Sequence, residues 1–335
     1  MKLLRIDVQN FRGVPDGTYE LGHGDAPHDV VVVTGRPSSG KASLLEAIVA
    51  AKEAAGPYGS PPDAKWCLRS GAMQGRVVTT WVLTEAEAEL AAQTSPVCTT
   101  SWDFGEGSAR VEGDSRVRQL LATHAPGPAS GKFEYFPATR RLFGEAWRPL
   151  PPPSKSAEKR LRLARDPEKY ACIRRMFVDL ALADGIRTAG ALALRGLAIQ
   201  GSQSDSLAPF KKALGTLAPD LRLVSVEPRE RSACILFQRR DGVQVELENL
   251  SDSEQQLVVF AATFVQQSLD NSVVLIDTPE ANIHPYEHVR LLQGLIGLGR
   301  GNQLIVATTS EAILRHASPR QVLDLSNRRT SRCAA

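Results

Sequence analysis

Residues 29–41 read DVVVVTGRPSSGK, in which a run of valines leads into a loop bounded by glycines and followed by lysine. A short continuous run of β-branched residues is typical of a strand buried on both faces. After residue 41, Leu44, Leu45 and Ile48 recur at helical spacing. Glycine, four residues, glycine and lysine between a strand and a helix form a phosphate-binding loop. This stretch therefore predicts an α/β fold of the P-loop NTPase type.

The loop and the first turn of the helix supply the expected nucleotide contacts. Glycines let backbone N–H groups turn towards phosphate oxygens, and the positive end of the helix faces the same anion. Lys41 is expected to reach the β- and γ-phosphates of a nucleotide. The alternative is a Ser/Gly turn that only caps a helix. The predicted cofactor-binding residues are Gly35, Arg36, Pro37, Ser38, Ser39, Gly40, Lys41, Ala42 and Ser43.

The expected magnesium site is incomplete in the sequence. The residue after the lysine should be Ser or Thr, whose hydroxyl holds Mg²⁺, but it is Ala42. Ser43 is a poor substitute because one step along a helix rotates a side chain by ~100°. A second apolar run, residues 273–276, ends at Asp277, which is expected to hold Mg²⁺ directly or through water. Taken alone, this run could equally be any core strand that ends in aspartate.

A third segment, residues 250–256, reads LSDSEQQ and precedes an apolar helix. Ser251 with Glu254 three residues later fits a helix-capping box, a role that does not exclude contact with a nucleotide. Five segments in order resemble the ABC-class ATPases of the RecF, SMC and overcoming-lysogenization-defect group, which have an AAA-type ATPase core. They are KLLRIDVQNFRG (2–13), GRPSSGKASLLEAI (35–48), LENLSDSEQQL (247–257), VVLIDTPEANIHP (273–285) and QLIVATTSEAIL (303–314).

The resemblance implies a P-loop, ABC-ATPase-like fold with a helical insertion subdomain. It also implies that two protomers close head to tail over two ATP molecules with Mg²⁺, forming a homodimer or a larger ATP-bridged assembly. In that arrangement the signature of one protomer, here Ser251 and Ser253, meets the γ-phosphate held by the other. A separately encoded protein partner and a role in DNA repair or phage defence rest on the same analogy.

The resemblance also locates departures at catalytic positions. Thr278 stands at the position of the catalytic glutamate, and threonine cannot accept a proton near neutral pH. Glu280 lies two residues further on. Thr309 stands at the position of the switch histidine. At the signature glycine, Ser253 adds a Cβ, and the preceding Asp252 adds negative charge near a phosphate.

These departures predict that hydrolysis is very slow or absent while ATP binding persists through the loop backbone, Lys41 and Asp277. One alternative is an active ATPase in which Glu280 or a partner supplies the missing base. Another alternative is a scaffold that no longer binds nucleotide.

Composition sets the remaining expectations. The chain has 335 residues, a net charge of +3 and five scattered cysteines, which favours reduced thiols in a cytoplasmic protein. No stretch approaches the ~18 apolar residues of a membrane span. The basic segment 155–175 is either a solvated helix face or a contact for DNA, and Arg140 and Arg141 are either near the nucleotide or in a solvated turn.

A proline-rich stretch, PLPPPSKS at residues 149–156, favours an internal boundary. The expected domains are an N-terminal ATPase lobe (1–148), a connector with a helical subdomain (149–220) and a C-terminal ATPase lobe (221–335).

Overall fold

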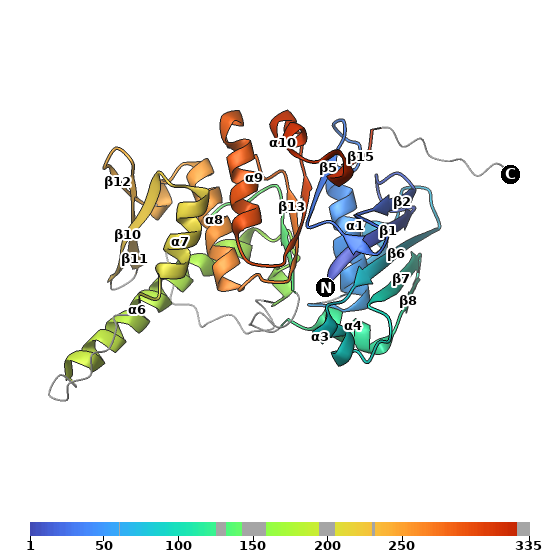
Figure 1. Ribbon diagram of the computed structural model, residues 1–335, viewed down its shortest axis with the longest axis horizontal. Helices are drawn as coiled ribbons and strands as arrows, with labels where there is room; N and C mark the ends of the chain where they lie inside the picture. The colour runs from blue at the N-terminus through green and yellow to red at the C-terminus, as the bar shows by residue number, and fades with distance from the viewer. Residues whose placement is uncertain (60, 125–131, 143–158, 194–204, 230–231, 327–335) are drawn as a thin grey trace. The chain divides into compact units, whose positions relative to one another are not determined.

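The computed structural model describes residues 1–59, 61–124, 132–142, 159–193, 205–229 and 232–326 (Figure 1). The chain divides into two compact units. The first unit comprises Met1–Ala138, Pro153–Arg165 and Leu269–Ala335, and the second comprises Thr139–Pro152 and Asp166–Ser268. No helix in the described part of the chain is both long and apolar enough to cross a bilayer.

The first unit contains a five-stranded parallel sheet with the strand order β15-β5-β14-β13-β9. Its strands are β5 (Val30–Thr34), β9 (Phe133–Phe136), β13 (Val273–Asp277), β14 (Gln303–Ala307) and β15 (Val322–Asp324). Both β13 and β14 are buried along their whole length, as their apolar runs predict. Because the strands are parallel, their carboxyl ends meet at one edge, and the loops that follow them share that edge.

An antiparallel sheet with the order β2-β1-β6-β7-β8 forms a second layer of this unit. Helix α1 (Lys41–Ala55) contacts β6 and β7 of this sheet and β13 and β14 of the parallel sheet. Since the helix lies between two sheets, Leu44, Leu45, Ile48 and Ala51 are all buried. The strands of the second layer are β1 (Lys2–Gln9), β2 (Gly17–Glu20), β6 (Gln74–Val82), β7 (Val97–Gly105) and β8 (Ser108–Glu112).

Shorter elements complete the first unit, and α9 packs against α10. They are β3 (Gly22–His23), β4 (Ala26–Pro27), α2 (Ala64–Cys67), α3 (Glu85–Leu90), α4 (Ser115–Ala122), η3 (Pro285–Glu287), α9 (His288–Gly297), α10 (Glu311–His316) and η4 (Pro319–Gln321).

The second unit packs helices against a three-stranded antiparallel sheet, β10-β11-β12. The ring of Phe177 lies edge-on to Phe210, with centroids 4.7 Å apart, and to Phe237, at 6.3 Å, so it joins two helices to the sheet. The elements are η1 (Pro167–Tyr170), α6 (Ala171–Ala193), α7 (Ala208–Leu217), β10 (Leu221–Arg229), β11 (Ser232–Arg239), β12 (Gln244–Glu246), η2 (Leu247–Asn249) and α8 (Asp252–Gln266).

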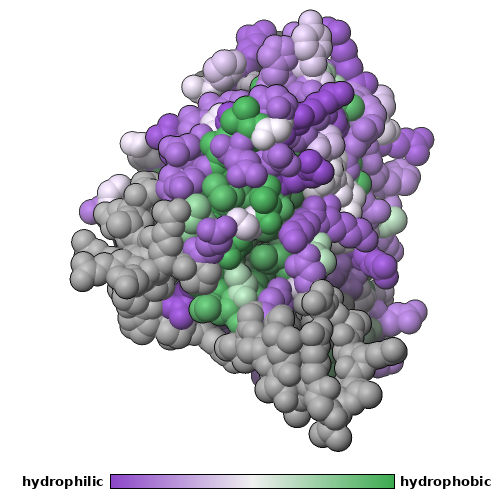
Figure 2. Space-filling model, turned by 90° about the vertical axis from the view of Figure 1, so that its left-hand side faces the viewer, coloured by the Kyte–Doolittle hydropathy of each residue, from purple (hydrophilic) through white to green (hydrophobic). Residues whose placement is uncertain are grey.

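Apolar side chains gather on one face of the second unit (Figure 2). Among the described residues of this unit, the exposed large apolar side chains are Leu182, Val224 and Val243. Val224 lies at an irregularity in the pairing of β10 with β11. Contiguous exposed apolar surface commonly marks a site of protein interaction.

The α/β class and the main parallel strands expected from the sequence are confirmed. The strands β7, β8 and β15 were not anticipated. The units differ from the division expected from the sequence, because residues 221–268 cluster with 166–220 and not with 269–335. Strand β10 packs on α6 and α7, which accounts for this grouping. The proline-rich stretch 149–156 and the tail after Ser326 lie outside the described residues.

Candidate nucleotide-binding site

Three loops of the first unit meet at the carboxyl edge of the parallel sheet, following β5, β13 and β14. The N–H of Thr308 donates to the carbonyl of Val33 at 3.0 Å, and that of Thr278 donates to the carbonyl of Ala307 at 2.8 Å. These hydrogen bonds extend the strand pairing into the loops. The expected phosphate loop, metal ligand and switch position therefore share one edge.

The backbone of the loop after β5 requires glycine at both ends. Gly40 has a φ of 96°, and a Cβ there would lie 2.7 Å from the carbonyl oxygen of Gly13. A Cβ on Gly35, where φ is 147°, would clash with Oγ of Ser39. At both positions the backbone has a positive φ, and a neighbouring atom lies where a Cβ would be. Only glycine accommodates this arrangement without strain.

The amino end of α1 is open towards this loop. Gly40 is its N-cap, no side chain caps the helix, and its first turn contains no acidic residue. Uncapped N–H groups together with the helix dipole form a site for an anion. The Nζ of Lys41 donates to the carbonyls of Gly35 at 2.8 Å and Arg36 at 3.0 Å, so the ammonium group lies against the loop.

The residues around Asp277 do not fit Mg²⁺ well. Magnesium prefers octahedral oxygen ligands, but position 42 offers a methyl group instead of a hydroxyl. Asp277 is 6% exposed, and its Oδ1 accepts a hydrogen bond from the hydroxyl of Thr278 at 3.1 Å. A cation already lies nearby, because Nη2 of Arg165 is 3.8 Å from Oδ2 of Asp277.

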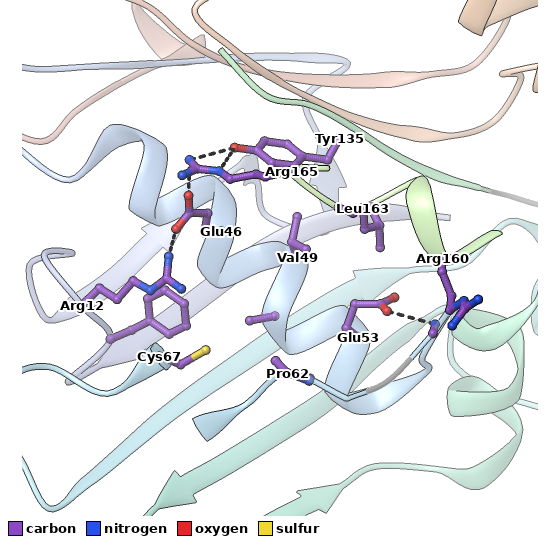
Figure 3. A pocket seen from close by; sticks show the side chains of 14 residues that line it. Arg12, Glu46, Val49, Glu53, Pro62, Cys67, Tyr135, Arg160, Leu163 and Arg165 are labelled. Atoms are coloured by element: carbon purple, nitrogen blue, oxygen red, sulfur yellow. Dashed lines mark hydrogen bonds and ion pairs between the residues drawn. The ribbon is translucent and has the colours of Figure 1, made fainter. Parts of the chain in front are cut away.

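Arg165 belongs to a charged cluster beside α1 (Figure 3). Its guanidinium group forms an ion pair with Glu46 of α1 and donates to the hydroxyl of Tyr135 from Nε at 3.3 Å and from Nη2 at 3.1 Å. Glu46 also pairs with Arg12. Burial raises the pKa of Tyr135 to about 12, so its hydroxyl stays protonated.

These side chains line a cavity of about 320 Å³. The sequence did not single out Glu46, Tyr135 or Arg165. The one sequence feature that pointed towards Arg165 was the basic character of segment 155–175.

Glu280 holds the loop that follows β14. Its Oε1 accepts hydrogen bonds from the hydroxyl of Thr308 at 2.6 Å and from the N–H of Thr309 at 2.9 Å. The residue is 7% exposed, and its Oε2 is buried and has no hydrogen-bond partner in the part of the chain that the structure describes. Glu280 thus fixes the position of Thr309 through one oxygen and leaves the other uncommitted.

Thr278, at the expected position of the catalytic glutamate, has a backbone φ of 50°. This conformation is an outlier for a β-branched residue. Backbone strain of this kind persists where the surrounding structure enforces it, as at functional sites. The Thr278 hydroxyl donates to Oδ1 of Asp277 at 3.1 Å.

The signature-like segment lies in the second unit, at the start of α8. Ser251 is the N-cap, and it forms a reciprocal capping box with Glu254. Glu254 also pairs with Arg239 through two bonds of 2.6 and 2.7 Å. Oγ of Ser253 is 3.1 Å from Oγ of Ser251. The capping interpretation of this segment is therefore confirmed, whereas contact of Ser251 and Ser253 with a nucleotide stays a prediction.

Arg140 and Arg141 face α8. The Nη2 of Arg140, a buried residue, donates to Oε1 of Gln256 at 2.9 Å. Nη2 of Arg141 lies 3.8 Å from Oδ2 of Asp252. Arg140 is thus a packed side chain of the second unit and not part of a solvated turn.

Several cations of the basic segment 155–175 are paired within their own unit. Arg162 lies 3.6 Å from Glu134, and Arg174 pairs with Glu248. Lys169 is buried. These pairs reduce the positive charge that the described part of the segment offers to DNA phosphates.

Comparison with known proteins gives a family. Residues 133–315 match the family described as "AAA domain, putative AbiEii toxin, Type IV TA system". The matched range includes β9, the second-unit helices, β13 and β14, and it begins after the loop at 35–41. No curated protein matches the sequence.

Two solved structures share the fold over almost the whole chain. One is described as the SmcHead bound to the C-winged helix domain of ScpA. It is 13% identical, has a TM-score of 0.59, and the match covers 97% of this chain and 94% of that chain. The other is the Smc head domain with an extended coiled coil bound to the C-terminal domain of ScpA, from Pyrococcus furiosus. It is 12% identical, has a TM-score of 0.54, and the match covers 96% of this chain and 92% of that chain.

Proposed function

This chain belongs to the AAA-domain family that its residues 133–315 match and has the P-loop ATPase fold of SMC heads, and on that premise we propose that it is an ATP-binding switch with slow or lost hydrolysis. One observation carries the proposal. The loop 35–41 adjoins open N–H groups at the start of α1 and carries the ammonium group of Lys41 against it, which supports an anion site there. The groups that cleavage needs are replaced at the same edge.

Three replacements support slow hydrolysis. Ala42 cannot ligate a metal, and the hydroxyl of Thr278 is bonded to Asp277. Thr309 is held through its backbone by Glu280 and has no ring nitrogen to contact phosphate. Loss of one stabilising group commonly costs about 10²–10³ in rate, and the effects of groups that act together need not add.

The proposed switch works through assembly. We propose that two copies of the chain close over ATP, with Ser251 and Ser253 of one copy near the phosphate held by the other. The capped start of α8 keeps these hydroxyls in a defined position, which supports this role. Without rapid hydrolysis, the assembly would persist until the nucleotide dissociates.

A separately encoded protein is the proposed target of the switch. The SMC heads of similar fold are described in complexes with domains of ScpA, and the exposed apolar side chains of the second unit would suit a protein partner. The family description names a toxin of a toxin–antitoxin system, and a phage-defence or DNA-repair setting follows by analogy alone.

Retention of labelled ATP tests this function. Purified protein is incubated with labelled ATP, the complex is isolated, and the bound nucleotide is identified beside a Lys41→Ala control. Intact ATP on the unmutated protein alone supports the switch. Accumulating ADP supports an enzyme, and no retention in either sample supports a scaffold that does not bind nucleotide.

An active ATPase is the second candidate, and one observation favours it. Oε2 of Glu280 is buried and has no hydrogen-bond partner among the described residues, and an uncommitted carboxylate oxygen is the kind of group that can accept a proton from water. Steady-state turnover that is abolished by Glu280→Gln, with folding and ATP binding intact, would favour this candidate over the switch.

A further inference from the structure

Asp277 has its charge balanced by the protein itself. This carboxylate ends β13 at the edge where the phosphate loop lies, and it is almost completely buried. Nη2 of Arg165 is 3.8 Å from its Oδ2, and the hydroxyl of Thr278 occupies its Oδ1 at 3.1 Å. The carboxylate therefore has a partner on each oxygen without a metal ion.

Arg165 is held in this position by three elements. Glu46 of α1 pairs with it, and the hydroxyl of Tyr135 on β9 accepts two of its hydrogen bonds (Figure 3). Asp277 of β13 attracts it as well. Arg12 pairs with Glu46 from the other side. The chain of charges Arg12, Glu46, Arg165 and Asp277 alternates in sign and sums to zero. The Arg165 side chain is 52% exposed, and these contacts hold its guanidinium group against both Glu46 and Asp277.

A magnesium ion at Asp277 would meet this guanidinium group. Two like charges so close together in a partly buried site are costly. The ion would also lack a hydroxyl ligand. In other P-loops the residue after the lysine is Ser or Thr, but here it is Ala42. The guanidinium group of Arg165 and the missing hydroxyl at Ala42 both disfavour a magnesium ion, and they are independent observations.

We propose that Arg165 supplies the positive charge that Mg²⁺ supplies at other P-loop sites, so that this chain binds a nucleoside triphosphate as the metal-free anion. The arginine neutralises Asp277, which would otherwise repel the triphosphate at the shared edge. Phosphate contact is left to the loop 35–41, the start of α1 and Lys41. This inference rests on the proposed nucleotide binding.

The test is calorimetric titration of ATP into the full chain, once with EDTA and once with excess Mg²⁺. We expect ATP to bind in EDTA and to bind more weakly in excess Mg²⁺, because that ion converts ATP into a complex whose metal the guanidinium group of Arg165 opposes. Equal dissociation constants under the two conditions would show that the site accepts the metal complex and would overturn the inference. Binding that requires Mg²⁺ overturns the inference and leaves the proposed nucleotide binding intact. Absence of binding under both conditions overturns both.

Variants at Arg165 sharpen the test. Arg165→Met should weaken binding in EDTA by about tenfold or more, and Mg²⁺ should restore part of it, because the guanidinium group no longer opposes a metal at Asp277. Adding Asp277→Asn to Arg165→Met should restore metal-free binding, since no charge remains to be balanced. Equal binding by Arg165→Met and the parent in EDTA overturns the inference.

Arg160 is the matched control because it lines the same cavity. Arg160→Met should bind ATP like the parent with and without Mg²⁺. Equal losses in Arg160→Met and Arg165→Met would indicate a general effect of cavity charge and overturn the specific role of Arg165. Melting temperatures identify any variant that has failed to fold, and the comparison of EDTA with Mg²⁺ on the parent chain needs no variant.

Discussion

Glu280 and Thr309 are joined across two loops, because the backbone N–H of Thr309 donates to Oε1 of Glu280 at 2.9 Å. The same oxygen accepts the hydroxyl of Thr308, which is 1% exposed, at 2.6 Å. The loop after β13 therefore sets the conformation of the loop after β14. Any movement at the nucleotide edge that displaces one of these loops must displace the other or break these bonds.

We expect Glu280→Ala to lower the free energy of unfolding by about 2–3 kcal/mol, because it leaves the buried hydroxyl of Thr308 without its acceptor. Glu280→Gln keeps an acceptor oxygen and should cost less than about 1 kcal/mol. Urea unfolding of both variants measures the difference. Equal stability of Glu280→Ala and the parent would show that this contact does not hold the loops together.

Gly40→Ala should abolish ATP binding and destabilise the protein by about 2 kcal/mol or more. The new Cβ would lie 2.7 Å from the carbonyl oxygen of Gly13, on a residue whose φ is 96°. Gly13→Ala is the matched control, since a Cβ at Gly13 has no heavy atom within 4 Å. Calorimetric titration and thermal unfolding report both effects. Loss of binding in both variants alike would contradict the argument from backbone geometry.

Lys52 makes stability depend on pH. Burial lowers the pKa of Lys52 from its ordinary 10.5 to about 7, partly offset by Glu53, whose carboxylate is 2.8 Å away. Between pH 7 and 10.5 the unfolded chain then binds more protons than the folded chain, so this lysine makes stability rise with pH across that window. The Nζ lies 2.9 Å from the ring centroid of Tyr58, a contact that favours the charged form and reduces the effect.

Lys52→Met should remove this pH dependence. We expect the free energy of unfolding of the parent to rise relative to that of the variant by about 1–3 kcal/mol as the pH rises from 7 to 9. Taking the difference between the two proteins at each pH cancels the titration of other groups. A difference that is constant with pH would show that Lys52 keeps an ordinary pKa in the folded protein.

The phosphate loop and Asp277 could be predicted because their chemistry depends on residues close together in the sequence. A glycine-bounded loop between a valine run and a helix, or an apolar run ending in aspartate, is visible locally. Arg165 could not be predicted in this way. Arg165 and Asp277 are far apart in the sequence, and the tertiary fold brings them together. No local sequence pattern encodes that contact.

The missed strands have a similar explanation. Strand β8, SARVE, is exposed or half-buried throughout, so its sequence lacks the apolar alternation of a core strand. Strand β15 spans only Val322–Asp324 and is fixed by pairing with β5. The grouping of residues 221–268 with 166–220 in one compact unit depends on the packing of β10 on α6 and α7, a tertiary contact that no local pattern encodes.

Rebuilding the metal site and the base together should restore hydrolysis. The triple variant Ala42→Ser, Thr278→Glu, Arg165→Met supplies a hydroxyl and a carboxylate base, and it removes the guanidinium group that opposes Mg²⁺ at Asp277. Glutamate also tolerates the φ of 50° at position 278 better than threonine, because it is not β-branched. We expect steady-state ATP turnover at least about tenfold above that of the parent, measured as phosphate release and abolished by EDTA.

A double variant that retains Arg165 distinguishes the effect of the added base from the effect of metal binding. With the guanidinium group still beside Asp277, Ala42→Ser with Thr278→Glu should turn over no faster than the parent, because Mg²⁺ remains excluded. Lys41→Ala in the triple background should abolish turnover and exclude a contaminating ATPase. If the triple variant binds ATP with Mg²⁺ and still does not hydrolyse it, the barrier lies outside these positions, and the loop held by Glu280 and Thr309 becomes the next element to alter.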